Sequence, residues 1–212
     1  QPPPSIQLLM RINVSAFLTA LTIATSLIVS YSASNQFFGT VKMPTLRNYG
    51  GTTFEDLQNL ELWRVATAQL IHAKQAHMLL NALCLLLLGG LVESKLGGLR
   101  TFSIWLIAGG VATALSPIFI EAPWDVGTGA SQATFAFAGC ATALAIFGFM
   151  KQTPAWILIV LVAAPGLTLD IIYSGYPKLG HVAGFALGFS FGIIYSRCSR
   201  QLPAHHKSTD LQ

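Results

Sequence analysis

The chain has 212 residues, of which 53% are hydrophobic and only 9% are charged, and its net charge is +4. A soluble domain usually carries about 25% charged residues, so this composition excludes an ordinary water-facing surface and indicates a protein that faces lipid. The basic residues are scattered rather than clustered, apart from a short C-terminal group, so no nucleic-acid surface is expected. The three cysteines have no metal-type or CxxC spacing and predict no disulfide framework: Cys84, Cys140 and Cys198.

Six apolar runs approach the length of about 20 residues that a membrane span needs. They are expected at about 13–34, 76–93, 101–120, 131–150, 154–173 and 179–195. The segment 35–75 between the first two runs mixes charged and aromatic residues, so we expect an ordered loop with short helices lying partly in the membrane interface. The predicted fold is an all-α membrane protein, a six-transmembrane-helix bundle with a large ordered first loop.

Lys and Arg residues in short loops set the orientation of a membrane protein. Outside the long loop, one side of the predicted spans holds only Lys178, and the other holds Arg11, Lys95, Arg100, Lys151, Arg197, Arg200 and Lys207. We therefore expect both termini in the cytoplasm, with the long loop and the start of the fourth span outside. The expected organisation is a tail at 1–12, a membrane domain at 13–196 and a polar cytoplasmic tail at 197–212.

The first group of polar residues inside a predicted span lies at the start of the second one. Such residues are costly in a membrane and count as functional candidates. His77 and Asn81 are four apart, which places them on one face of a helix. They could point at one small volume, or they could join helices through hydrogen bonds. A metal site is not expected, because His72 and His77 are five apart and no HExxH motif is present.

The second group is Gly127-Thr128-Gly129-Ala130-Ser131-Gln132, which opens the fourth span. Small residues before Ser131 permit a tight, closely packed turn. A serine at the start of a helix can be a simple N-cap. The same position has a functional interpretation, because free N–H groups at a helix start can stabilise a developing negative oxygen.

The third group lies on the sixth span, where glycines recur every four residues at positions 180, 184, 188 and 192. Such a ladder lets another helix approach almost backbone to backbone. His181 lies three residues before Gly184 and seven before Gly188, so it shares roughly their face. This histidine is expected to meet a neighbouring helix, as a structural hydrogen bonder or a proton relay.

The three groups, in this order and in six spans, resemble the rhomboid family of intramembrane serine proteases. The resemblance covers about residues 60–192 and agrees with the large first loop. The matching residues are Trp63-Arg64, His72, His77, Asn81, Glu93, Gly97, Gly129-x-Ser131, Phe135, Gly139 and His181-x-x-Gly184-x-x-x-Gly188.

The resemblance implies a Ser–His dyad in a water-filled cavity below the membrane surface, with Ser131 as nucleophile and His181 as general base. It also implies that the Ser131 N–H, His77 and Asn81 hold the oxyanion. Four further residues would support the site: Gly129, Gly184, Gln132, and Phe135 where the family often has a tyrosine stacked on the catalytic histidine.

One residue beside the nucleophile departs from the family motif, and one acidic residue lies outside the family motifs. The usual Gly-x-Ser-Gly motif reads Gly129-Ala130-Ser131-Gln132, so Gln132 adds a bulky polar side chain beside the nucleophile. No acidic third member is evident in the matched segments. Asp170 is near His181 in sequence, but no family motif supports a role for it.

The resemblance predicts an intramembrane serine endopeptidase that cleaves single-span membrane proteins in the bilayer, without a cofactor, in a bacterial inner membrane. An alternative is a catalytically inactive rhomboid-like protein that binds membrane clients, which Gln132 favours. A small proton-coupled transporter would suit the intramembrane histidines and Asp170. Against a transporter, the sequence has no inverted repeat and no matching pair of Gly/Pro-interrupted spans.

Overall fold

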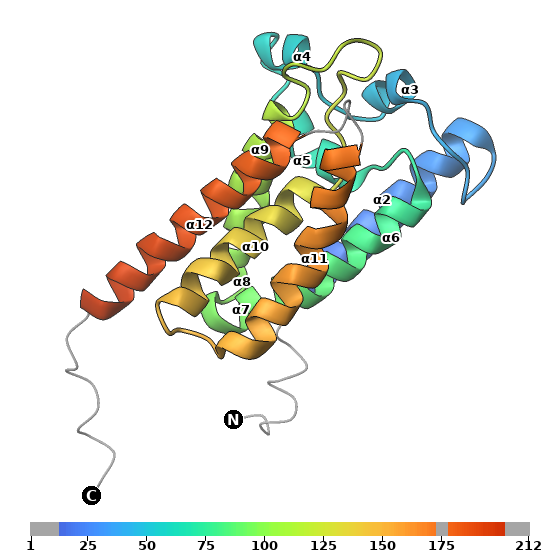
Figure 1. The fold of residues 1–212 in the computed structure, drawn as a ribbon. Coiled ribbons are helices and arrows are strands. Elements are labelled where there is room, and N and C mark those ends of the chain that lie inside the picture. Colours follow the sequence, from blue (N-terminus) through green and yellow to red (C-terminus); the bar gives the residue numbers. More distant parts are fainter. Residues whose placement is uncertain (1–12, 173–177, 202–212) are drawn as a thin grey trace, which may run out of the picture.

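The computed structural model describes residues 13–172 and 178–201, which are mainly helical (Figure 1). In chain order the helices are α2 (Val14–Ser34), α3 (Met43–Asn48), α4 (Phe54–Gln58), α5 (Arg64–Thr67), η1 (Ala68–Leu70), α6 (Gln75–Cys84), η2 (Leu85–Gly89), α7 (Gly90–Leu96), α8 (Gly98–Ser103), η3 (Ile104–Gly109), α9 (Gly110–Leu115), α10 (Ser131–Ile146), α11 (Gln152–Ile172) and α12 (Lys178–Gln201). The segments α6, η2 and α7 follow without a break, as do α8, η3 and α9, and in each case the middle segment is π-helical.

Five helices among the described residues are long and apolar enough to cross a membrane: Val14–Ser34, Gln75–Leu96, Gly98–Leu115, Ala155–Ile172 and Leu179–Arg200. They confirm the predicted all-α membrane class. The sixth predicted span is α10, which is apolar but has only 16 residues. The predicted count of six spans is therefore not matched exactly, since α10 is shorter than the roughly 20 residues that span a bilayer.

Several predicted boundaries were wrong for identifiable reasons. The fourth span was expected to reach Met150, but α10 ends at Ile146 because Gly148 adopts φ +78° and closes a Schellman motif. In that motif the N–H of Phe149 donates to the Leu144 carbonyl. The third span was expected to reach position 120, but the helix ends at Leu115, shortly before Pro117, and proline disfavours helix in the residue that precedes it. The sixth helix continues to Gln201, beyond the expected 195.

The contact between α10 and α12 forms the centre of the bundle. Every residue of α10 from Ser131 to Ala145 is buried. A Cβ added at Gly188 would collide with the Ala136 carbonyl, and one added at Gly184 would collide with the Gln132 carbonyl. The glycine ladder therefore packs backbone to backbone against another helix, as the sequence predicted, and that helix is α10. We call this α10–α12 contact the glycine seam.

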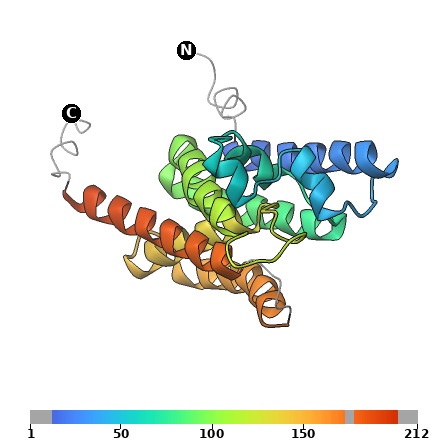
Figure 2. The same cartoon turned by 90° about the horizontal axis from the view of Figure 1, so that it is seen from above.

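Helix α11 is held much more loosely than the glycine seam. Only 18% of its membrane-spanning window is buried, compared with 50% for the window in Gln75–Leu96. It packs mainly against α10, with a smaller contact to η2. In Figure 2 it lies on the opposite side of the bundle from α2. Much of its surface is therefore left to face lipid.

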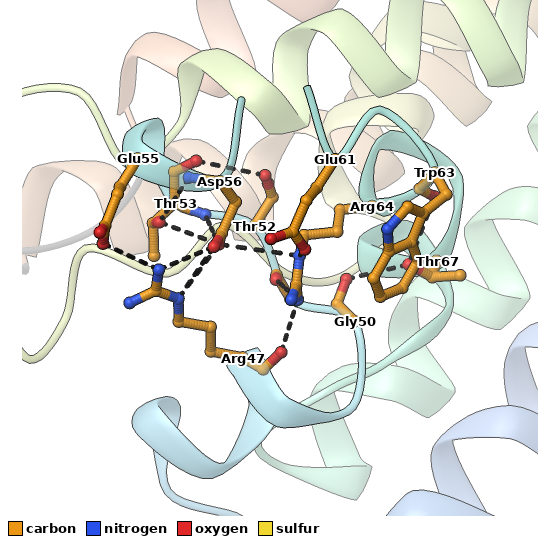
Figure 3. Close-up of polar contacts among 11 residues, drawn as sticks. Arg47, Gly50, Thr52, Thr53, Glu55, Asp56, Glu61, Trp63, Arg64 and Thr67 are labelled. Atoms are coloured by element: carbon orange, nitrogen blue, oxygen red, sulfur yellow. Dashed lines mark hydrogen bonds and ion pairs between the residues drawn. The ribbon is translucent and has the colours of Figure 1, made fainter. Parts of the chain in front are cut away.

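The long first loop is ordered, as expected, and its short helices α3 and α4 gather at one end of the bundle (Figure 1). Its centre is an ion-pair cluster around Asp56, which is 2% exposed (Figure 3). Burial opposes ionisation of Asp56, but hydrogen bonds from Arg47 and Thr53 outweigh it and hold the pKa of that carboxyl below its ordinary value. Arg64 donates 2.6 Å and 2.8 Å hydrogen bonds to the carbonyls of Arg47 and Gly51, so the cluster also fixes the loop backbone.

Candidate active site

The turn that leads into α10 is held by the first loop at three points. Thr52 and Gly127 exchange backbone hydrogen bonds of 3.1 Å and 2.7 Å. The N–H of Gly129 donates to the Ala68 carbonyl at 2.8 Å, with φ +86° at Gly129, a conformation that favours glycine. The N–H of Ala130 donates to His72 Nε2 at 3.3 Å. The loop thus fixes the backbone immediately before Ser131.

Ser131 is the first residue of α10 and not its N-cap. The cap position belongs to Ala130, which has no side-chain cap, and the helix begins with a 3.0 Å hydrogen bond from Thr134 N–H to the Ala130 carbonyl. The simple N-cap interpretation of Ser131 is therefore wrong. The N–H groups of a first helical turn have no carbonyl partner within their own helix, so the helix start presents donors beside the serine.

Ser131 and His181 are 50 residues apart in sequence and meet across the glycine seam. The Ser131 Oγ lies 2.9 Å from His181 Nε2, and His181 is 1% exposed. Phe135, one turn beyond Ser131, stacks on the imidazole with ring centroids 4.4 Å apart and an interplanar angle of 8°. The structure thus brings together Ser131, His181 and Phe135 in the arrangement that the resemblance implied.

Asp170 on α11 joins this pair, which the sequence interpretation did not anticipate. Its Oδ2 lies 2.8 Å from His181 Nδ1, and the residue is 8% exposed. The available signal was an acidic side chain inside a predicted span, which is a functional candidate by default. Sequence reasoning missed the contact because the fold, and not sequence spacing, brings α11 to α12.

A small cavity of about 20 Å³ lies beside Ser131, roughly enough for one water molecule. Its lining includes His77, Asn81, Ser131 and His181. The pair on α6 therefore does converge with the serine–histidine pair on one volume, as the first of the two interpretations of His77 and Asn81 predicted.

His72 links Asn81 to the turn before Ser131. Its Nε2 lies 3.2 Å from Asn81 Nδ2, and its Nδ1 lies 2.9 Å from the hydroxyl of Ser26 on α2. The Ser26 hydroxyl donates to the Leu70 carbonyl, so His72 donates from Nδ1 and accepts at Nε2. Burial lowers the pKa of His72 to about 3, which agrees with a neutral ring. One N–H of the Asn81 amide is thus directed to His72, and the other is left for an acceptor in the cavity.

Gln132 is not among the residues that line the cavity. It is 0% exposed and lies in the glycine seam, where a Cβ at Gly180 would come within 3.1 Å of Gln132 Cγ. Its Oε1 lies 3.3 Å from Ser131 Oγ, which is longer than a typical O–H···O hydrogen bond. The side chain that departs from the family motif is therefore accommodated between helices, with its carbonyl turned toward the serine hydroxyl.

Two other residues that carried the resemblance support the scaffold. Arg64 belongs to the loop cluster described above and lies over the Trp63 ring, 4.5 Å from its centroid. Glu93 accepts hydrogen bonds of 2.8 Å from the backbone N–H groups of Val14 and Ser15. A carboxylate at this position caps α2 and complements the helix dipole. Neither residue lies in the site.

The fold and the site define a class of multi-pass integral membrane protein with a serine–histidine pair buried between its central helices. A family model of the Rhomboid domain matches residues 59–198, which is more than half of the chain, and the chain belongs to the rhomboid family. Membership supports intramembrane protease-type function in general.

Curated relatives resemble the chain at low identity. RHOMBOID-like protein 4 of Arabidopsis thaliana is 28% identical over 71% of this chain and 38% of its own length. Rhomboid-like protease 5 of Toxoplasma gondii is 28% identical over 75% of this chain and 18% of its own length, and Rhomboid-like protease 3 of the same organism is 25% identical over 75% and 61%. The chain thus spans less than two thirds of each relative. These relatives are eukaryotic and do not support the expected bacterial inner membrane.

Proposed function

We propose that the protein is an active intramembrane serine endopeptidase that cleaves single-span membrane proteins. The observation that carries the proposal is the 2.9 Å contact between Ser131 Oγ and His181 Nε2, buried inside a membrane bundle. A serine hydroxyl is a weak nucleophile until a neighbouring base takes its proton, and a histidine at hydrogen-bonding distance provides that base.

In the proposed reaction, Ser131 Oγ attacks the carbonyl carbon of the scissile peptide while His181 Nε2 takes the hydroxyl proton. The C–N bond then breaks, and His181 returns the proton to the leaving amine. Water hydrolyses the resulting acyl-enzyme by the same steps and frees Ser131. Phe135, stacked on the imidazole, would hold the ring in the plane that this exchange requires.

The oxyanion would form in the cavity beside Ser131. Candidate donors are the Ser131 backbone N–H at the start of α10, the second N–H of Asn81, and His77. Donors fixed in a partly dehydrated site can each contribute several kcal/mol to the stability of the transition state. His72 would then orient Asn81. The 3.2 Å contact between His72 Nε2 and Asn81 Nδ2 takes up one of the two amide protons of Asn81 and leaves the other for the cavity.

The test is cleavage of a generic single-span substrate by the purified protein in detergent, compared with the Ser131→Ala variant. We expect the parent to cleave and the variant to be inactive but folded, with an unchanged thermal unfolding temperature. Cleavage by both proteins would indicate a contaminating protease and contradict the assignment. A parent that binds the substrate without cleaving it would favour the client-binding alternative.

The orientation in the membrane is part of the same proposal. Ser131 opens α10 at the end of the bundle where the first loop gathers, so the site would open to the non-cytoplasmic side if both termini are cytoplasmic (Figure 1). The excess of Lys and Arg on the terminal side supports this orientation. An impermeant thiol reagent added outside intact cells or vesicles should not label the exposed Cys198. Labelling is expected once the membrane has been permeabilised.

A further inference from the structure

Asp170 reaches the imidazole of His181 because of a local feature of α11. Val162, Gly166 and Asp170 are spaced by four residues, so they share one face of the helix. A Cβ added at Gly166 would come within 2.6 Å of the Phe135 ring, which shows how closely α11 approaches the site at this turn. One turn further along, the Asp170 carboxylate meets His181 Nδ1 at 2.8 Å.

The chemistry of this contact constrains the proton on the imidazole. An ionised carboxylate can only accept hydrogen bonds, so the 2.8 Å contact requires a proton on His181 Nδ1. Nε2 of the neutral ring is then an acceptor, and the Ser131 hydroxyl donates to it. In the other tautomer, Nε2 would donate to Ser131, and the serine proton would turn to its other acceptor, Gln132 Oε1 at 3.3 Å. That arrangement leaves the serine without a base.

The geometry points to Asp170 as a positioning residue that completes a Ser131–His181–Asp170 triad, holding His181 in the tautomer that accepts the serine proton. This inference rests on the proposed function of Ser131 and His181. Once Nε2 has taken the proton, the carboxylate also stabilises the imidazolium at 2.8 Å, as the aspartate of a serine protease triad does. Asp170 itself does not touch the substrate.

A purely structural role fits the environment of Asp170 poorly. Its second oxygen, Oδ1, is buried and has no hydrogen-bond partner among the described residues. A buried carboxylate that is only half satisfied carries a large desolvation cost, but removing it alone also leaves the buried His181 Nδ1 without this partner. The Asp170→Leu substitution is therefore expected to cost some stability, and its kcat is expressed per folded protein, which separates catalysis from stability.

The experiment compares the parent with Asp170→Leu, Asp170→Asn and the matched control Thr168→Val, which alters an exposed polar side chain on the same helix. We expect Asp170→Leu to lower kcat by about 10²–10⁴-fold with KM nearly unchanged, because the triad acts on the chemical step. Asp170→Asn should lose at least as much, since its amide N–H can donate to Nδ1 and hold His181 in the other tautomer. Thr168→Val should keep the parental kcat.

A second measurement reads the tautomer directly. In protein carrying ¹⁵N-histidine, His181 Nδ1 should be protonated in the parent, and the proton should move to Nε2 in Asp170→Leu. An unchanged kcat per folded protein in Asp170→Leu, or an unprotonated Nδ1 in the parent, would overturn the role of Asp170 while Ser131 and His181 keep theirs. A parent that cannot cleave would instead remove the proposed function, and the ¹⁵N spectrum would still decide whether Asp170 holds the Nδ1 proton.

Discussion

The glycine seam and helix α11 contribute to the same site but differ in how closely they are packed. In the seam, α10 and α12 touch through their backbones, because any Cβ at Gly184 or Gly188 would collide with a carbonyl of α10. Helix α11 buries only 18% of its membrane-spanning window and meets the site through the face that carries Gly166 and Asp170.

This difference separates two tasks. The proposed reacting groups, Ser131 and His181, lie on the seam, where backbone contact leaves little freedom in the distance between them. Asp170, which would set the tautomer, lies on α11, whose membrane-spanning window is the least buried of the five. Substitution of the seam glycines should therefore damage folding and catalysis together, whereas changes at Asp170 should act mainly on catalysis.

Removing either reacting group should abolish proteolysis. We expect His181→Ala to be as inactive as Ser131→Ala, a loss of about 10⁴-fold or more, and the double variant to be no worse than either single variant, because the two groups act as a unit. Initial cleavage rates in detergent measure this. Additive losses in the double variant would mean that the two residues act independently.

Widening the seam should lower stability and activity together. Gly188→Leu places a side chain on the Ala136 carbonyl and should destabilise the protein by about 3 kcal/mol, near the upper end for overpacking. The matched control is Ala164→Leu, on an exposed position of α11, which should cost much less. Thermal unfolding and cleavage rates are measured on both variants. Equal effects of the two substitutions would contradict the distinction between seam and α11.

Asn81→Ala should act on the transition state. We expect kcat and kcat/KM to fall by similar factors of about 10- to 1000-fold, with little change in KM, because one oxyanion donor of several is lost. Titration of active serines in the same samples counts the folded sites. If Asn81 only joins helices, the variant should lose about 1 kcal/mol of stability and keep a normal kcat per titrated site.

The loop cluster offers a smaller effect that depends on pH. The pKa of Asp56 is lower in the folded protein than its ordinary value of 3.8. The ionised carboxylate therefore stabilises the fold fully above pH 3.8, and this stabilisation is lost as the pH falls through the pKa of the folded protein. At pH 7, Asp56→Asn should cost roughly 1–3 kcal/mol. The difference from the parent in unfolding temperature should shrink below about pH 4. Glu55→Gln, which alters an exposed partner of the same Arg47, should have little effect at any pH.

Much of the bundle could be predicted from the sequence because lipid imposes a strong rule on composition and span length. The glycine spacing also predicted the seam, since only a backbone-to-backbone contact requires a glycine on every turn. Helix ends were less predictable: α10 stops early because of the Schellman motif at Gly148, and such motifs depend on local backbone geometry.

The site was predictable in part. Ser131, His181, His77 and Asn81 were recognised from their order, and all four line one cavity. Asp170 and the link through His72 were missed, because both depend on contacts between helices that sequence spacing does not encode. The effect of Gln132 was also open until its side chain was placed in the seam, between α10 and Gly180.

An activated Ser131 should react covalently with a fluorophosphonate, whereas an ordinary serine hydroxyl should not. The protein is incubated with the reagent in detergent, and the modified peptide is located by mass spectrometry. We expect one adduct per molecule, on Ser131, and none on folded His181→Ala protein, which keeps the serine but lacks its base. An unlabelled parent, or equal labelling of Ser131 in the parent and in His181→Ala, would contradict this expectation.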